Sequence, residues 1–312
     1  MRMIVLGAAA GGGFPQWNCT CANCARARQA DPAAPARTQS SLAVSADGES
    51  WLLLNASPDL RQQIAATPAL HPRRDSPDGH LRDTPLAAVL VTNADVDHIG
   101  GLINLREGQP FALYASTRVH GHLDGDRVFD VLDRSVVPRR TLPLDRPLAI
   151  ADAAGREIGL RVETFAVPGK VPLYLEAGAE SLSGEAGDTV AVRLIDDRHG
   201  REAYYVPNCA RIDGDLRERL SGAAVVFFDG TLFDDEEMVR AGLSRKTGQR
   251  MGHVSMDGPD GAIARLADLA IGRRIFVHVN NSNPALLAES QARARVEAAG
   301  WEVAHDGLEV TT

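Results

Sequence analysis

Short apolar runs bounded by turn residues recur along the chain, and each is typical of a β-strand. The first, residues 1–6, leads into a glycine-rich turn. Residues 40–45 and 51–55 flank an Asp-Gly pair and predict a hairpin. Further strands are predicted at residues 86–91, 111–114, 148–167, 225–229 and 275–278, with a short last strand after residue 307.

Helical signals fall between these strands. Helices are predicted to start at residues 55–59 and to cover residues 116–123, 233–239, 259–270 and 284–300. The last of these has the strongest amphipathic pattern in the chain. Strand-rich halves with late helices predict an α/β protein, a four-layer αβ/βα sandwich of two similar halves in one domain over residues 1–312.

Composition and charge narrow the class of function. The 312 residues are 44% hydrophobic and 24% charged, as in an ordinary globular protein. The formal net charge of -8 argues against nucleic acid or an anionic membrane as partner, because clustered Lys and Arg bind such surfaces. No apolar run approaches the roughly 18 residues of a membrane span. Residues 1–10 begin like a secretion signal but run into three glycines, so we expect a first strand and a cytoplasmic protein.

Three of the four cysteines crowd into one loop, at about residues 14–25. They are Cys19, Cys21 and Cys24. The C-x-C-x-x-C spacing is a poor disulfide framework, but it can place three thiolates on one tetrahedral zinc ion. Such a zinc would be structural, because four protein ligands leave no open position. The alternative is three reduced, inert cysteines. The candidates for the fourth ligand are Cys209, His253 and Asn281.

A second polar cluster follows the strand at 86–91, in the stretch T-N-A-D-V-D-H-I-G-G. Its ionisable residues are Asp95, Asp97 and His98. Metal ligands and catalytic groups often lie where a strand gives way to a loop, and the closing Gly-Gly could open a helix. The alternative is a helix cap, in which Asn93 or Asp97 accepts free backbone N–H groups.

The order T-x-x-x-D-x-D-H-x-G-G resembles the T-H-x-H-x-D-H-x-G-G signature of the metallo-β-lactamase superfamily. Asp97 and His98 match it, whereas Asn93 and Asp95 stand at the two other histidine positions. The stretch V-P-G-K-V-P carries Lys170 where the superfamily often places a third histidine. The resemblance therefore implies that a first metal position has been lost.

The same resemblance implies that a second metal position is retained. Asp229 ends an apolar run where the superfamily has a bridging aspartate, and His278 ends another where it has its last histidine. Taken singly, Asp229 could be a helix cap and His278 a satisfied core histidine. With Asp97 and His98, His278 forms an open face of two imidazoles and one carboxylate, which suits non-haem Fe(II). A dinuclear zinc hydrolase would need the missing histidines.

Four further stretches extend the resemblance: G-A-A-A-G-G-G-F-P-Q-W-N-C-T-C-A-N-C, F-F-D-G-T-L-F-D-D-E-E-M, M-G-H-V-S-M and H-V-N-N-S-N-P. With the motif above, they resemble the coenzyme PQQ synthesis protein B (PqqB) family over nearly the whole chain. The resemblance implies a metallo-β-lactamase-like sandwich and a role in making pyrroloquinoline quinone (PQQ) from a Glu and a Tyr of a precursor peptide. The family is viewed both as an iron-dependent hydroxylase of the tyrosine-derived ring and as a carrier that helps export PQQ to the periplasm.

The ligand set favours the hydroxylase, because ring hydroxylation needs a metal that activates dioxygen and a carrier needs no open metal position. We expect Fe(II) at the active site, replaced by zinc in some preparations, besides the structural zinc. Asp97, His98 and His278 are expected to bind Fe(II), and Asp229 to be a further ligand or to orient bound water. Lys170 is expected to pair with a substrate carboxylate or quinone oxygen, the alternative being a solvated lysine.

Asp95 and His253 are candidate proton-transfer groups. His253 could instead orient a ligand of the active-site metal without binding the metal itself, or be the fourth ligand of the structural zinc. Two other functions stay open: a soluble carrier of PQQ or its precursor, and a mononuclear metal-dependent hydrolase or phosphodiesterase. The expected partner is the small-molecule PQQ precursor or PQQ. Contacts with other PQQ-biosynthesis proteins and a homodimer are left open.

Overall fold

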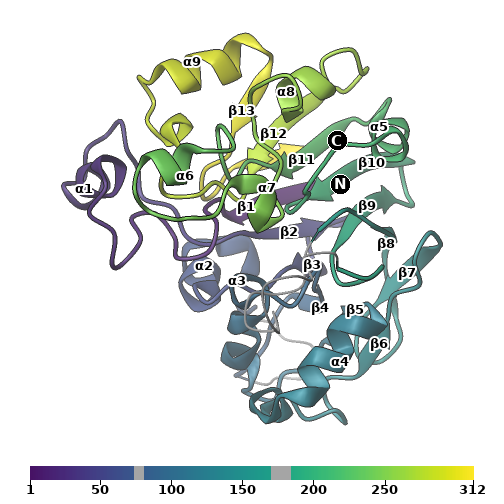
Figure 1. The fold of residues 1–312 in the computed structure, drawn as a ribbon. Helices are drawn as coiled ribbons and strands as arrows, with labels where there is room; N and C mark the ends of the chain where they lie inside the picture. The colour runs from purple at the N-terminus through teal and green to yellow at the C-terminus, as the bar shows by residue number, and fades with distance from the viewer. Residues whose placement is uncertain (74–80, 170–183) are drawn as a thin grey trace.

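The computed structural model describes residues 1–73, 81–169 and 184–312. Within these ranges two seven-stranded β-sheets pack face to face, and helices lie on their outer faces (Figure 1). This order of layers confirms the predicted αβ/βα sandwich of the α/β class. Each half of the chain builds one sheet, except that the last strand returns to the first sheet.

The first sheet has the strand order β14-β1-β2-β3-β4-β5-β6. Its strands are β1 (Arg2–Gly7), β2 (Ser41–Ser45), β3 (Trp51–Leu54), β4 (Leu86–Leu90), β5 (Ala112–Ala115), β6 (Arg139–Thr141) and β14 (Glu309–Thr311). The pairs from β14 to β3 are antiparallel and those from β3 to β6 are parallel. The predicted hairpin is confirmed, because β2 pairs with β3 with Val44 opposite Leu52.

The second sheet has the order β13-β12-β11-β10-β9-β8-β7. Its strands are β7 (Pro147–Ala151), β8 (Glu157–Ala166), β9 (Val190–Asp196), β10 (Arg201–Val206), β11 (Val225–Asp229), β12 (Arg273–Val277) and β13 (Trp301–Val303). The pairs from β7 to β10 are antiparallel and those from β10 to β13 are parallel. In open α/β sheets, ligands bind outside the carboxyl ends of parallel strands, so β4, β11 and β12 are the strands to follow.

The helices are short. The α-helices are α1 (Ala22–Arg28), α2 (Leu60–Ala66), α3 (Val96–Ile99), α4 (Thr117–Gly125), α5 (Gly214–Leu220), α6 (Glu237–Arg240), α7 (Gly248–Met251), α8 (Ala262–Arg265) and α9 (Gln291–Ala298). The 3-10 turns are η1 (Pro68–Leu70), η2 (Gly100–Leu105), η3 (Arg127–Val131) and η5 (Pro284–Leu286). No helix within the described ranges is long and apolar enough to cross a membrane.

Three clusters of buried apolar side chains hold the layers together. The central one lies between the sheets and includes Leu52, Leu90, Val192 and Phe227. The other two fill the outer layers, under α2 and α4 on the first sheet and under α5, α8 and α9 on the second. Each large aliphatic side chain that is buried in this way contributes about 1.5–3 kcal/mol.

Three predicted helices are too long. The predicted helix at 284–300 is two separate elements, η5 and α9, because Ser290 accepts a hydrogen bond from Arg293 N at 3.0 Å and starts a new helix. The predicted helix at 233–239 shrinks to α6, and the one at 259–270 to α8, which begins after Gly261. Turns capped by short side chains replace the missing helical residues.

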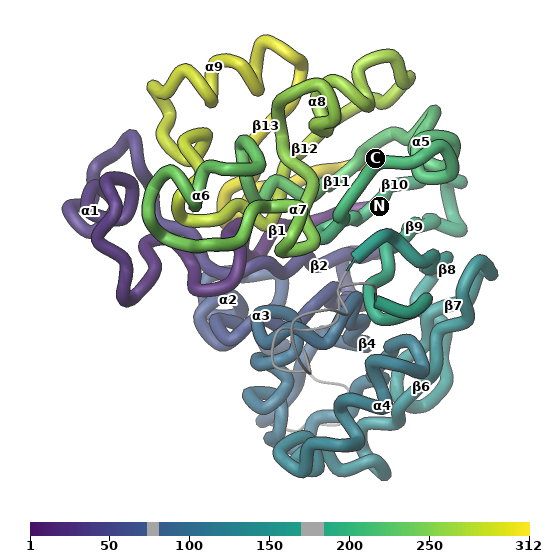
Figure 2. Tube along the Cα trace, in the orientation of Figure 1, coloured from purple at the N-terminus to yellow at the C-terminus, as the bar shows by residue number. Residues whose placement is uncertain are grey.

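The two ends of the chain lie side by side (Figure 2), and Thr312 N donates a hydrogen bond to Met1 O at 3.2 Å. The N-terminal loop is also tied to the C-terminal half. Asn23 Nδ2 donates to the carbonyl oxygens of three consecutive residues that lead into η5, Asn281, Ser282 and Asn283, each at 3.1 Å. The cysteine loop is therefore fixed against the segment that follows β12.

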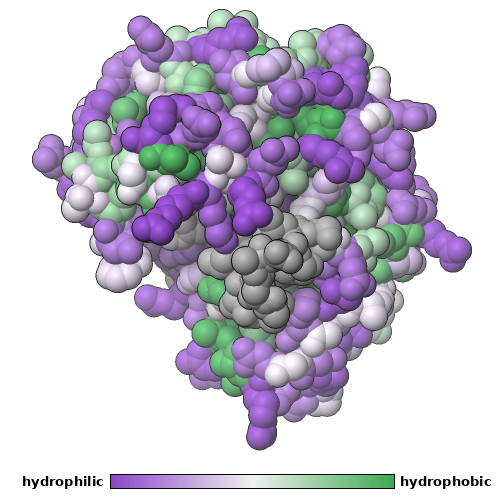
Figure 3. Space-filling model, viewed as in Figure 1, coloured by the Kyte–Doolittle hydropathy of each residue, from purple (hydrophilic) through white to green (hydrophobic). Residues whose placement is uncertain are grey.

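The molecular face in Figure 3 is mainly hydrophilic, and its apolar residues are scattered in small groups. The exposed large hydrophobic residues include Trp17, Val128 and Val239, which lie on separate segments. Single exposed apolar side chains of this kind are normal on a globular protein.

Candidate metal centre

Predicted ligands from both sheets converge at the carboxyl ends of three parallel strands. Asp97 and His98 lie on α3, which follows β4, whereas Asp229 ends β11 and His278 follows β12. The ligand atoms of Asp97, His98 and His278 lie within 4.8 Å of one another. A second group of this kind comprises Asp229, His253 and His278, so His278 belongs to both.

Close packing of Gly101 against the segment that precedes α2 fixes the position of α3. Gly101 N donates to Ala56 O at 2.8 Å, and a Cβ on Gly101 would lie 2.0 Å from Ser57 O, so no larger residue fits. The Gly-Gly pair follows α3 and opens the 3-10 helix η2, as the sequence suggested. Asp97 and His98 are consequently on the helix itself and not in the loop before it.

The first group is tightly packed. Asp97 Oδ2 lies 2.9 Å from His278 Nε2 and 3.9 Å from His98 Nε2. The rings of His98 and His278 meet edge to face, with centroids 5.3 Å apart. His98 is fully buried, and its Nε2 has no hydrogen-bond partner among the described residues. A buried polar nitrogen without a partner is costly, so this atom marks a place for a ligand that the side chains do not supply.

Burial and close charges set the protonation of this group. Burial lowers the pKa of His98 to about 4, which keeps the imidazole neutral near pH 7. Burial would raise the pKa of Asp97, but the imidazoles of His98 and His278 outweigh it and hold this pKa well below its usual range. Burial also opposes the charged form of His278, yet the hydrogen bond to Asp97 and the nearby carboxylates raise its pKa.

The second group is built around Asp229. Its Oδ2 accepts hydrogen bonds from Cys209 N at 2.9 Å and lies 2.8 Å from His253 Nδ1. Its Oδ1 accepts from the backbone N–H of Thr231 at 3.0 Å and from the Thr231 hydroxyl at 2.7 Å. Burial opposes the charge on Asp229, but His253 and these donors lower its pKa overall. Both carboxylate oxygens are therefore engaged already.

His278 has an unusual backbone. Its φ is +56°, in the left-handed region that residues other than glycine seldom adopt. The Thr231 hydroxyl lies 3.0 Å from the His278 carbonyl oxygen, and the segment continues into Val279, whose N–H donates to Ala8 O at 2.9 Å. Strained backbone of this kind clusters at functional sites, where the surrounding contacts hold it in place.

The residues at the superfamily's other histidine positions have separate roles. Asn93 Oδ1 accepts a hydrogen bond from Asp95 N at 2.9 Å, a local contact before α3, whereas the side chain of Asp95 makes no capping hydrogen bond to the helix within the described residues. Asp95 precedes α3 and is partly exposed, and its charge contributes to the raised pKa of His278. Lys170 lies outside the described residues.

The three cysteines of the N-terminal loop also form one group. The sulfur atoms of Cys19, Cys21 and Cys24 lie within 4.8 Å of one another. Burial and the neighbouring thiols raise the pKa of Cys21 to about 11, whereas burial of Cys19 is outweighed by hydrogen bonds from the backbone and side chain of Cys21 and from Asn281, which lower the pKa of Cys19. A fourth side chain, that of Asn281, reaches it, with Nδ2 at 3.2 Å from Cys19 Sγ and 3.3 Å from Cys24 Sγ.

The other two candidates for a fourth zinc ligand lie elsewhere. Cys209 contacts Asp229 and Arg211 through its N–H and its thiol, and His253 groups with Asp229 and His278. Of the three candidates, Asn281 alone contacts the thiols within the described part of the chain.

Known proteins resemble this chain in sequence and architecture. Residues 50–279 match the family described as "Beta-lactamase superfamily domain". The chain is 54% identical over 311 residues to "Coenzyme PQQ synthesis protein B" of Gluconacetobacter diazotrophicus, covering 99% of each chain. The chain belongs to the PqqB family. The crystal structure of Zn(2+)-bound PqqB from Methylobacterium extorquens is 50% identical and matches all of both chains with a TM-score of 0.94.

Membership of the PqqB family confirms the metallo-β-lactamase fold. A more distant structure, that of a diphosphatase from the PhnP family, is 20% identical and has a TM-score of 0.65 over 99% of this chain. At that identity the likeness concerns the fold alone.

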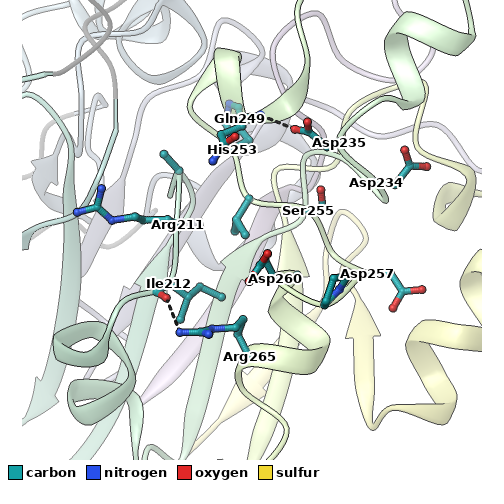
Figure 4. Close-up of a pocket in the computed structure, with 15 residues that line it drawn as sticks. Arg211, Ile212, Asp234, Asp235, Gln249, His253, Ser255, Asp257, Asp260 and Arg265 are labelled. Atoms are coloured by element: carbon teal, nitrogen blue, oxygen red, sulfur yellow. Dashed lines mark hydrogen bonds between the residues drawn. The ribbon is translucent and has the colours of Figure 1, made fainter.

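A cavity of about 520 Å³ lies beside His253 (Figure 4). Its walls include Arg211, Arg265, Asp235 and Asp260, and Figure 4 shows Arg211 and Asp235 on opposite sides of His253. Charges of both signs therefore face a space large enough for a small molecule. His253 borders this cavity and also belongs to the group that contains Asp229 and His278.

Sequence reasoning did not single out Thr231, although it lies in the quoted F-F-D-G-T stretch. Its hydroxyl contacts Asp229, His253 and His278. Thr92, at the head of the other motif, similarly lies 3.4 Å from His98 Nδ1. The available signal was a threonine just after β4 and just after β11, in the motifs that carry predicted ligands.

Proposed function

We propose that this chain acts in PQQ biosynthesis as an Fe(II)-dependent hydroxylase, which uses dioxygen on the tyrosine-derived ring of the Glu-Tyr precursor. The observation that carries the proposal is the grouping of Asp97, His98 and His278 at the strand ends. Two imidazoles and one carboxylate with further positions open are the ligand set of non-haem iron oxygenases. Membership of the PqqB family supports the pathway.

The side chains of this group fit a metal ion. His98 Nε2 is buried without a hydrogen-bond partner among the described residues, and a cation would supply the missing interaction. The neutral state of His98 leaves a nitrogen lone pair available, and Asp97 contributes a negative charge. Fe(II) held by these residues would supply the activation of dioxygen, which side chains alone do not provide.

Neighbouring residues would orient the site and move protons. Because both oxygens of Asp229 already accept hydrogen bonds, we assign it mainly to fixing His253, with direct metal binding as the alternative. His253 lies between the cavity and the buried ligands, where a proton-transfer group would be needed. Asp95 is the partly exposed carboxylate whose charge acts on His278, and we assign it to passing protons to solvent.

The cysteine group is proposed to hold a structural zinc, with Asn281 as the fourth ligand. The amide of Asn281 contacts the thiols, and rotation of this amide would exchange its nitrogen for its oxygen, which can bind a cation. Asn281 lies three residues after His278, so a zinc ion here would also hold the segment that carries His278.

The test is oxygen uptake. Protein stripped of its active-site metal is loaded with Fe(II) without oxygen and then mixed with oxygen and dihydroxyphenylalanine or a Glu-Tyr-derived substrate. We compare the wild type with His278→Ala and with His120→Ala. His120 is a matched control, because it is also a buried histidine but lies on α4 and contacts Arg140 O. Substrate-dependent uptake should persist in the control and disappear in His278→Ala.

Other outcomes would point to the other functions. Tight PQQ binding without oxygen uptake, unaffected by His278→Ala, would replace the hydroxylase by a carrier. Turnover of a phosphodiester by the zinc- or manganese-loaded protein, again without oxygen uptake, would replace it by a hydrolase.

A further inference from the structure

Each histidine of the two metal-binding groups has a threonine hydroxyl at its Nδ1 atom. Thr231 Oγ1 lies 2.8 Å from His278 Nδ1 and 3.0 Å from His253 Nδ1. Thr92 Oγ1 lies 3.4 Å from His98 Nδ1. Both threonines are buried, at 5% and 0% exposure, so water does not compete freely for these contacts. A hydroxyl has one proton to donate and two lone pairs that accept, and the remaining partners decide where that proton goes.

The partners of Thr92 settle the direction of its hydrogen bonds. The backbone N–H of Thr92 donates to Asn55 Oδ1 at 2.9 Å, which identifies this atom of Asn55 as an acceptor. The Thr92 hydroxyl lies 3.1 Å from the same oxygen and donates to it. The hydroxyl oxygen is then left to accept from His98 Nδ1–H. His98 Nε2 consequently carries the lone pair, and this is the buried nitrogen that has no protein partner among the described residues.

The partners of Thr231 likewise place a proton on Nδ1 of its two histidines. Its hydroxyl lies 2.7 Å from Asp229 Oδ1 and 3.0 Å from the His278 carbonyl oxygen, and both of these atoms can only accept. The hydroxyl proton therefore points to them, and the two lone pairs accept from Nδ1–H of His278 and of His253. His253 Nδ1 also lies 2.8 Å from Asp229 Oδ2, a second acceptor that requires the same proton.

We propose that Thr231 and Thr92 are positioning residues that hold His278 and His98 with a proton on Nδ1, so that Nε2 is the nitrogen left to bind the metal, and that Thr231 orients His253 in the same way. This inference rests on the metal centre proposed above. Hydrogen bonds of this kind to the outer nitrogen of a ligating histidine fix its tautomer and ring orientation, and their loss typically lowers metal affinity about 10–100-fold.

Thr231 holds two of the three rings and one carboxylate through a single oxygen. Valine has nearly the shape of threonine but no hydroxyl, so Thr231→Val removes the hydrogen bonds with little change in volume. Serine retains the hydroxyl and loses a methyl group. The matched control is Thr164→Val, because Thr164 is equally buried, at 1% exposure, and its hydroxyl donates to Pro143 O, in the strand β8.

The first measurement is the affinity for zinc of the site that is lost in His278→Ala, by competition with a chelator of known affinity. Thr231→Val should weaken this affinity about 10–100-fold, whereas Thr231→Ser and Thr164→Val should stay within about threefold of the wild type. The second measurement is the nitrogen NMR spectrum of histidine-labelled, metal-free protein. The Nδ1–H signatures of His253 and His278 should be present in the wild type and Thr231→Ser, and absent or averaged in Thr231→Val.

The possible outcomes separate this inference from the proposed metal centre. If His278→Ala binds as much zinc as the wild type, the metal centre itself is wrong. If the wild type has this site and Thr231→Val binds zinc equally well with unchanged histidine signals, the inference is overturned. Should Thr231→Val fail to fold, the pair Thr92→Val and Thr92→Ser decides in the same way at His98, where valine should weaken zinc binding and serine should restore it.

Discussion

Replacement of Glu237 by glutamine should remove a loss of stability that the wild type suffers as the pH rises. Glu237 begins α6 and is 7% exposed. Its Oε1 accepts a hydrogen bond from Ser282 Oγ, and its Oε2 accepts one from Phe233 N, both at 2.6 Å. Burial nevertheless outweighs these donors and raises the pKa of Glu237 from 4.5 to about 7.

The sign of the effect follows from proton binding in the two states. Between the two pKa values the folded chain holds a proton that the unfolded chain has released, so the free energy of unfolding falls as the pH rises. The contribution is complete below the unfolded pKa and is lost as the pH passes the folded pKa. The difference in pKa corresponds to about 3 kcal/mol, of which about 2 kcal/mol falls between about pH 5.5 and about pH 8.5.

Glutamine cannot ionise, so it does not undergo this loss. One of its two oxygens becomes an NH₂ group facing a donor, which costs a similar amount at every pH and leaves the pH dependence unaffected. Urea unfolding at constant zinc concentration measures the wild type, Glu237→Gln and a control, Glu218→Gln, on the exposed side of α5. The difference between wild type and Glu237→Gln should change by about 2 kcal/mol over this range. Parallel curves for these two proteins would refute the claim that burial governs this carboxyl.

Three further changes test the core, a cap and the cysteine loop. Trp301→Ala removes a ring that is 2% exposed and whose centroid lies 4.1 Å from that of the stacked Phe276 ring. The free energy of unfolding in urea should fall by about 3–5 kcal/mol. A decrease below about 1 kcal/mol would contradict the place of Trp301 in the core. Ser290→Ala removes the acceptor for Arg293 N at the start of α9 and should cost about 1 kcal/mol, which Ser290→Thr should largely restore. Cys24→Ser should lower the zinc content by one ion per chain and lower the midpoint of thermal unfolding; an unchanged zinc content would count against a structural zinc in this loop.

The grouping of Asp97, His98 and His278 could be predicted from the sequence because these residues stand at the ends of apolar runs. Asp97 and His98 share one motif, and His278 ends the run that forms β12, so a resemblance in short motifs was sufficient. Thr92 and Thr231 could not be recognised in this way. Threonine beside a strand is an ordinary β-former, and its role depends on imidazoles that other segments bring to it.

Helix lengths were predicted less well, and α9 shows the reason. The periodic pattern of residues 284–300 is real, but the Ser290 hydroxyl satisfies a backbone N–H and starts the helix afresh. Only Ala292 and Val296 of α9 are buried, so the apolar face is narrower than the pattern suggested. Competition between a side-chain acceptor and the helix itself is decided by local geometry, which periodicity does not contain.

Asn93 shows what occupies a position that the superfamily motif gives to histidine. Its side chain is 1% exposed, and its Oδ1 accepts from Asp95 N at 2.9 Å, directly before α3 begins. This local bond needs the short amide of asparagine or the carboxylate of aspartate, and an imidazole in its place would remove it. The start of α3 determines where Asp97 and His98 point. The asparagine therefore fixes the backbone directly before the helix that carries Asp97 and His98, which a histidine at this position would not do in the same way.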